Sequence, residues 1–245
     1  MPSGIIFIIT LLSFIITAPV TKKKITFEAP DSLIITADLY IAQEGFPYII
    51  LFHQEGSSRG EYNETAVKLT KLNYNCLAID LRSGDNENFV SNETARRARQ
   101  MGKPSRFLDA SADVKAAIDY AYSISEKEVI LVGSSYSASL CILIGKDHPN
   151  VKAVIAFSPG EFFGDDLRVE NELTSFDKPL FVTGARTESE YISRMLYHLE
   201  EDQYTFFEPV DSSGVHGSKA LWEDNDAKDQ YWLALLLFFN SLKDS

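Results

Sequence analysis

Cysteine and histidine are scarce in this sequence. Among its 245 residues there are two cysteines and four histidines. Cys76 and Cys141 each lie inside an apolar run, so we expect two buried free thiols rather than a disulfide bridge or a pair of metal ligands. No group of histidines and cysteines has metal-ligand spacing, and no glycine-rich phosphate loop is present. We therefore expect neither a metal nor another cofactor.

Basic residues are also in short supply. The chain has 23 Lys and Arg against 35 Asp and Glu, which gives a net charge of −12. A field of this sign repels phosphate backbones, so we expect no nucleic acid as a partner. The hydrophobic share of 45% is that of an ordinary globular chain, which excludes a disordered or collagen-like protein.

The start of the chain lacks charge altogether. From Ile5 to Ile16 only Thr10 and Ser13 interrupt an apolar run. This run is shorter than the roughly 20 residues of a membrane span, and it is typical of a secretory signal peptide. Two features disagree with this interpretation, the absence of Lys and Arg before the run and the proline that follows Ala18, and they leave an uncleaved membrane tether as the alternative.

The sequence therefore predicts two parts. Residues 1–20 are a signal peptide or an N-terminal membrane tether, with a buried first strand as the third alternative. Residues 24–245 form one folded domain. We expect the protein to be exported, as a periplasmic or secreted protein, or to stay attached to the membrane through residues 1–20 alone.

Beyond residue 24, short β-branched apolar runs alternate with longer amphipathic stretches. That alternation predicts an α/β fold, with a mostly parallel eight-stranded sheet and helices on both faces. The predicted strands are Lys24–Phe27, Leu33–Tyr40, Pro47–His53, Asn75–Asp80, Glu128–Ser134, Val151–Ser158, Pro179–Gly184 and Gln203–Val210. Helices are predicted over Leu108–Ser123 and Asp229–Leu242. No linker or repeat is present, so we expect a single domain and a monomer.

One motif indicates a catalytic residue. Gly133-Ser134-Ser135-Tyr136-Ser137 follows the fifth predicted strand and precedes an apolar helical stretch. A sharp turn from strand to helix, with small residues on both sides of a serine, is the context of a nucleophile elbow. The sequence therefore predicts Ser135 as a nucleophile.

A serine hydroxyl needs a base to accept its proton. His216 lies in a glycine-containing loop between the last predicted strand and the last predicted helix, where it can reach across the strand ends. His148 and His198 lie in polar surroundings and are expected at the surface, whereas His53 ends the third predicted strand. We therefore predict that His216 is the catalytic base.

An acid that orients the histidine should lie between Ser137 and His216, at the end of a strand. Glu188, which follows the seventh predicted strand, is the first choice. The sixth predicted strand is followed by Glu161, which is the alternative acid. Glu190 and Asp211 are the remaining choices.

These residues resemble the α/β-hydrolase superfamily, and in particular its dienelactone-hydrolase-like branch of compact single-domain enzymes. The resemblance spans Lys24 to Leu242. It depends on the elbow and on three further segments, which are Leu51–Ser58, Asp80–Gly84 and His216-Gly217.

The resemblance implies an oxyanion hole made of two backbone N–H groups, those of Gln54 and Tyr136. It also implies that no large cap domain covers the site. The chain departs from the family pattern at Gln54 and Ser137, where glycine is common. It also departs at the acid, because Thr187 occupies the family's usual position three residues after a glycine.

The resulting prediction is an exported serine hydrolase that cleaves a small carboxylic ester, thioester or lactone through an acyl-enzyme. Two alternatives remain. One is a non-catalytic binding protein on the same fold, and the other is an acyltransferase or peptidase with the same three residues.

The long polar connection Arg82–Arg106 is locally basic in its second half. Arginine can hold a carboxylate through two parallel hydrogen bonds. Arg97 and Arg99 are therefore predicted to bind an anionic group of the substrate, with an ordinary solvated surface as the alternative.

Overall fold

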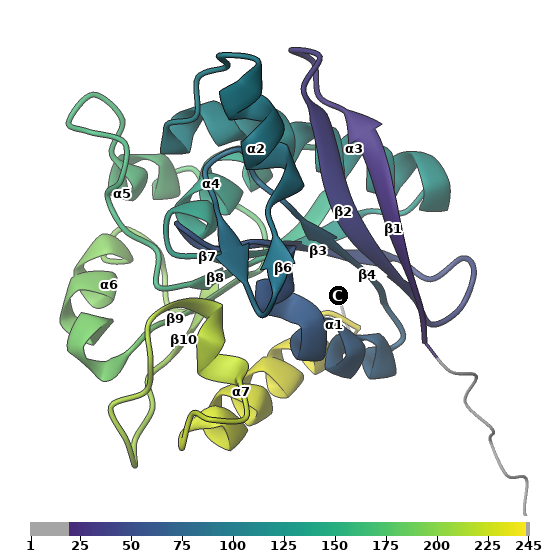
Figure 1. The fold of residues 1–245 in the computed structure, drawn as a ribbon. Coiled ribbons are helices and arrows are strands. Elements are labelled where there is room, and N and C mark those ends of the chain that lie inside the picture. Colours follow the sequence, from purple (N-terminus) through teal and green to yellow (C-terminus); the bar gives the residue numbers. More distant parts are fainter. Residues whose placement is uncertain (1–19, 244–245) are drawn as a thin grey trace, which may run out of the picture.

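The structure is a computed structural model that describes residues 20–243. Its centre is an eight-stranded sheet in the order β1-β2-β4-β3-β7-β8-β9-β10 (Figure 1). The strands of this sheet are β1 (Thr21–Glu28), β2 (Ile34–Ile41), β3 (Tyr48–Phe52), β4 (Asn75–Ile79), β7 (Val129–Ser134), β8 (Val151–Phe157), β9 (Leu180–Thr183) and β10 (Tyr204–Phe207). Each of the eight predicted strands corresponds to one of them. The predicted single-domain α/β fold is confirmed.

The direction of the strands decides where a site can form. Antiparallel pairing joins β1 to β2 and β2 to β4. The other six strands of the sheet run parallel to one another. Their carboxyl ends therefore lie at one edge, where ligands bind in open α/β sheets.

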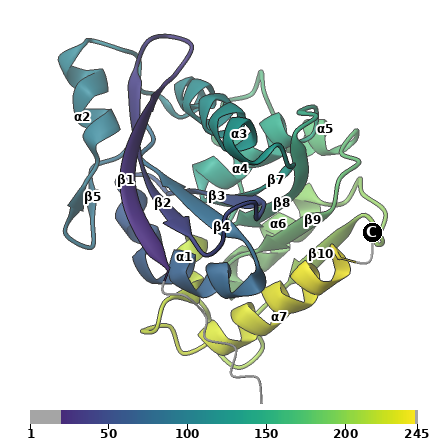
Figure 2. The ribbon, with the colours of Figure 1, turned by 90° about the vertical axis from the view of Figure 1, so that its right-hand side faces the viewer.

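Helices cover both faces of the sheet, as the alternating pattern predicts (Figures 1 and 2). One face packs against α1 (Asn63–Leu69) and α7 (Lys228–Ser241). The other packs against α2 (Glu93–Gln100), α3 (Ser111–Ser125), α4 (Tyr136–Gly145), α5 (Val169–Leu173) and α6 (Ser189–Met195). The two predicted helices correspond to α3 and α7.

The long polar connection has structure of its own. It contains a two-stranded hairpin, β5 (Asn86–Glu87) and β6 (Val90–Ser91), followed by α2. Its start is held by Arg82, whose guanidinium pairs with Asp113 at 2.7 Å and with Asp31 at 2.9 Å. Arg82 therefore fixes the connection to the fold.

Both cysteines are buried and free, as predicted. Within residues 20–243, no group of three or more potential ligands could hold a metal ion. No helix in the same range has the length and apolar character needed to cross a membrane. The predicted signal peptide or tether lies outside the described residues, so export stays a prediction.

Candidate active site

Ser135 occupies the sharp turn between β7 and α4. Its backbone has φ 61° and ψ −126°, a conformation that L-residues rarely adopt. Such strain persists only where the surrounding structure enforces it, and it is concentrated at functional sites. The side chain is mostly buried, with 7% of its surface exposed.

The flanking residues make the turn possible. A Cβ on Gly133 would lie 2.4 Å from the Cα of Ala138, so only glycine lets the strand approach the helix this closely. On the other side, the Oγ of Ser137 lies 2.7 Å from the carbonyl oxygen of Phe52 and accepts the Ser134 N–H at 2.9 Å. Ser137 therefore fits where the family has glycine, and its hydroxyl ties the elbow to β3.

Ser137→Gly should therefore destabilise the protein although it restores the common family pattern. Loss of the buried hydrogen bonds should cost about 1–3 kcal/mol, and glycine in a helix costs roughly another 0.5 kcal/mol. Urea unfolding of the parent, Ser137→Ala and Ser137→Gly should rank their stabilities in that order. A Ser137→Gly protein as stable as the parent would contradict this account.

His216 lies beside Glu188. Its Nδ1–H donates to Glu188 Oε1 at 2.5 Å, because a carboxylate can only accept. This hydrogen bond raises the pKa of His216 against the opposing effect of burial. Burial alone would raise the pKa of Glu188, but the hydrogen bonds from His216, Ser158 and the Ala185 N–H outweigh it and lower that pKa.

The second oxygen of Glu188 is held as firmly as the first. Oε2 accepts the hydroxyl of Ser158 at 2.6 Å and the N–H of Ala185 at 2.8 Å. The same Ser158 oxygen accepts the N–H of Gly217 at 2.9 Å. Ser158 thus connects the acid to the histidine loop, a role that no sequence pattern indicated.

The histidine loop is also attached to the elbow. Ser134 Oγ accepts the N–H of Ser218 at 2.9 Å, which places Ser135 and His216 on two segments that lie side by side. Among the described residues, no hydrogen bond joins Ser135 Oγ to His216. Such contacts are often long without substrate and shorten when substrate binds.

The segments that follow β7, β9 and β10 therefore bring together a strained serine, a paired carboxylate and a histidine. The fold that does this is similar to solved structures of ester-cleaving enzymes. A Pyrococcus furiosus esterase matches with a TM-score of 0.66 at 16% identity, over 90% of each chain. A dienelactone hydrolase from Anabaena variabilis gives 0.66 at 15% identity, over 89% of this chain and 95% of the other. The esterase domain of a Rhodothermus marinus protein gives 0.61 at 15% identity, over 91% and 99%.

The chain has the α/β-hydrolase fold. No protein-family model and no curated protein matches the sequence.

The alternative acid Glu161 and the other three histidines of this α/β-hydrolase fold have other partners. Glu161, the alternative acid, accepts the N–H groups of Val169 and Glu170, so it caps α5 and does not contact His216.

His53 is fully buried, and its Nε2 accepts the N–H of Leu81 at 3.0 Å, so it stabilises the fold. His198 is exposed, as expected, and lies against the ring of Tyr197, whereas His148 is half-buried, 3.8 Å from Asp119.

The N–H of Gln54, one of the two predicted oxyanion donors, already has an acceptor in the structure. It donates to Glu61 Oε2 at 3.1 Å, so this amide is not free to hold an oxyanion. The other oxygen of Glu61 accepts the hydroxyl of Ser218 at 2.5 Å, so the buried Glu61 joins the Gln54 loop to the histidine loop. Within residues 20–243, the N–H groups of Tyr136 and of Glu55 have no acceptor.

The two arginines that are predicted to bind substrate contact other parts of the chain in the structure. Arg97 donates from Nη1 to two oxygen atoms of β2, at 3.0 and 2.7 Å, and pairs with Glu93 at 3.2 Å. Arg99 is exposed and donates to the carbonyl of Gly84 at 3.3 Å. Neither lines the pocket beside His216. Binding of substrate by these two arginines therefore stays a prediction.

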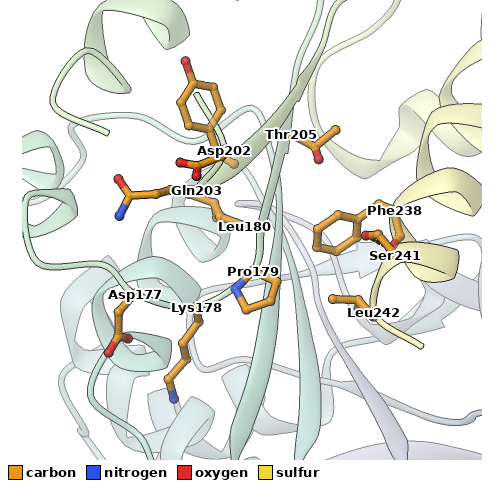
Figure 3. A pocket seen from close by; sticks show the side chains of 11 residues that line it. Asp177, Lys178, Pro179, Leu180, Asp202, Gln203, Thr205, Phe238, Ser241 and Leu242 are labelled. Carbon is orange, nitrogen blue, oxygen red and sulfur yellow. Dashed lines mark hydrogen bonds between the residues drawn. The ribbon is translucent and has the colours of Figure 1, made fainter. Parts of the chain in front are cut away.

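Two pockets of about 410 Å³ lie at opposite ends of the parallel strands. One lies beside His216, at the carboxyl ends of β8 and β9. The other lies at the amino ends of β9 and β10, where Phe238 and Ser241 of α7 and the following Leu242 line it (Figure 3). Only the first pocket borders the residues described above.

Proposed function

We propose that the protein is a serine hydrolase that cleaves a small carboxylic ester, thioester or lactone through an acyl-enzyme. The observation that carries the proposal is the hydrogen bond between Glu188 and His216 beside the strained Ser135. The likeness to esterases and dienelactone hydrolases supports the same class of reaction.

In the first half of the reaction Ser135 Oγ attacks the carbonyl carbon while its proton passes to His216 Nε2. Glu188 holds the imidazole with Nδ1 protonated and stabilises the imidazolium. The bond to the leaving oxygen, or to the sulfur of a thioester, then breaks, and His216 returns the proton to that atom. A water molecule, activated by the same histidine, hydrolyses the acyl-enzyme and frees Ser135.

Negative charge builds up on the carbonyl oxygen in each half of the reaction. The free N–H of Tyr136, next to the nucleophile, can stabilise it. Since the N–H of Gln54 is occupied by Glu61, the next amide, that of Glu55, is the second donor that we propose. The proposed reaction uses only these side chains and backbone N–H groups, and it involves no cofactor.

Labelling with a fluorophosphonate, followed by a panel of short-chain esters, tests the function. Labelling detects an activated serine without knowledge of the substrate. Labelling together with ester hydrolysis supports the proposal. Labelling with transfer to amines or alcohols, or with peptide cleavage, would favour an acyltransferase or a peptidase. The absence of labelling would favour a non-catalytic binding protein.

The pH dependence should reflect the pairing of His216 with Glu188. Only neutral imidazole can accept the serine proton, so kcat/KM should rise as His216 loses its proton. Because Glu188 raises the pKa of His216, the midpoint of this rise should lie above the ordinary value of about 6.5. Measurement of kcat/KM from pH 5 to 9 checks this. A midpoint below 6.5 would contradict the pairing.

A further inference from the structure

The pocket beside His216 has a defined position relative to the reacting groups. It is formed by residues 158–162, by Thr187 and Glu188, by Tyr191 of α6 and by His216 itself. Ser135 does not line it, and neither of the proposed oxyanion donors does. The pocket therefore lies on the histidine side of the site.

Two aromatic side chains give this pocket its apolar surface. Phe162 is 36% exposed and Tyr191 is 37% exposed, so both rings lie partly open to the cavity. Tyr191 is held in place because its hydroxyl accepts the N–H of Glu161 at 2.7 Å. Phe162 meets the edge of Phe107, with ring centres 6.2 Å apart, and Phe107 stacks on Tyr136 at 4.4 Å. A series of ring contacts thus connects the buried Tyr136, the residue after the nucleophile, to the pocket.

The ring of Phe162 depends on a glycine. A Cβ on Gly160 would lie 2.9 Å from the Cε2 atom of Phe162, closer than real Cβ contacts allow. The absence of a side chain at position 160 therefore lets this ring lie against the backbone and leaves the cavity open.

While His216 is neutral, as it must be to accept the serine proton, the charged side chains that line the pocket are all negative. Glu161 and Glu188 line it, and no lysine or arginine does. The nearby Arg168 is paired with Glu170 at 2.9 Å. A carboxylate that entered this pocket would lose its water and meet like charges, which is unfavourable on both counts. A neutral group avoids both costs.

We propose that this pocket binds the alcohol portion of the ester and that this portion carries a neutral aromatic ring, as a benzyl ester does. The inference rests on the proposed function. Since His216 protonates the leaving oxygen, the alcohol portion lies on the histidine side of the reacting carbon. Rings that pack against Phe162 and Tyr191 gain contacts that a saturated ring of similar size lacks.

The test compares esters that differ only in one ring. Benzyl acetate should be cleaved with a kcat/KM about tenfold above that of cyclohexylmethyl acetate. With the ring on the acyl side, methyl phenylacetate and methyl cyclohexylacetate should differ less than about threefold, because that side lies outside the pocket. The anionic ester 4-carboxybenzyl acetate should be at least about tenfold worse than benzyl acetate.

Substitutions in the pocket test whether the preference for the benzyl ester arises there. Phe162→Leu and Tyr191→Leu should each move the ratio of benzyl to cyclohexylmethyl ester toward one. The matched control is Phe89→Leu, because Phe89 is a fully exposed phenylalanine of the β5–β6 hairpin that does not line the pocket. This control should keep the parent ratio.

The possible results distinguish a failure of the aromatic-pocket inference from a failure of the proposed hydrolase function. Equal kcat/KM for benzyl and cyclohexylmethyl acetate, in a protein that is labelled by fluorophosphonate, would overturn the aromatic pocket and leave the hydrolase intact. A preference that appears only on the acyl side would also overturn it. A protein that is neither labelled nor active on any ester would overturn the proposed function and this inference with it.

Discussion

Ser135→Ala should abolish labelling by a fluorophosphonate and lower ester turnover by about 10⁴-fold or more. The reason is that the hydroxyl of Ser135 is the only group that forms the covalent bond in the proposed reaction. The His216–Glu188 pair should persist, because no contact of that pair involves the Ser135 side chain. The comparison is made at equal folded yield, verified by circular dichroism.

Ser134→Ala is the matched control for this substitution. The two serines are neighbours, but Ser134 is fully buried and its Oγ accepts the N–H of Ser218. Its loss should loosen the histidine loop and reduce turnover by less than about tenfold, with labelling retained. Equal loss from both substitutions, or no loss from either, would refute the assignment of Ser135 as the nucleophile.

The sheet could be predicted from the sequence because its strands are short, buried and rich in β-branched residues. Val129–Ser134 is one such strand, and every one of its side chains is buried. The β5–β6 hairpin could not be predicted in this way. Its strands have two residues each, and its turn places Asn88 and Phe89 at positive φ, where glycine or asparagine is the usual choice.

Candidates for the nucleophile, the acid and the base could be chosen from the sequence, because their order along the chain and their positions after strands restrict the choice. The hydrogen bond between His216 and Glu188 agrees with the choice of Glu188 over Glu161, while the catalytic roles stay predictions. Glu188 lies one residue beyond the family's usual position. A short 3₁₀ turn, Arg186–Glu188, accommodates that residue and brings the carboxylate back to the end of β9.

Two residues of the site gave no signal in the sequence. Ser158 is one of many serines, and only its contacts with Glu188 and Gly217 distinguish it. Glu61 is one of 35 acidic residues, and its burial against Gln54 and Ser218 follows from tertiary packing alone. Both residues belong to the site only because of contacts between segments that are distant in the sequence, and no local sequence pattern indicates such contacts.

Glu188→Gln should be the second most damaging substitution, with a loss of about 10³- to 10⁴-fold in kcat/KM. The side chain keeps its shape, so the folded yield should match the parent. Glu161→Gln should cost less than about tenfold, since Glu161 caps α5 and does not touch His216. Glu190, which is exposed and two residues from Glu188, supplies the matched control Glu190→Gln, with expected activity equal to the parent.

The large loss of activity expected for Glu188→Gln follows from the direction in which the glutamine amide must face. The position of Oε2 receives two donors, the hydroxyl of Ser158 and the N–H of Ala185, so the carbonyl oxygen of the glutamine should lie there. Its NH₂ group then faces His216 Nδ1, which must become an acceptor. The imidazole proton is thereby placed on Nε2, the nitrogen that should accept the proton of Ser135.

This orientation predicts an order of activities that a simple loss of charge does not. Glu188→Ala removes the carboxylate but leaves the imidazole free to adopt either tautomer, so a folded Glu188→Ala protein should retain more activity than Glu188→Gln. Steady-state kinetics on the two purified variants, with ¹⁵N spectra of the His216 ring to identify the tautomer, measure this directly. A glutamine variant more active than the alanine variant, or Glu161→Gln more damaging than Glu188→Gln, would remove Glu188 from the role of orienting acid.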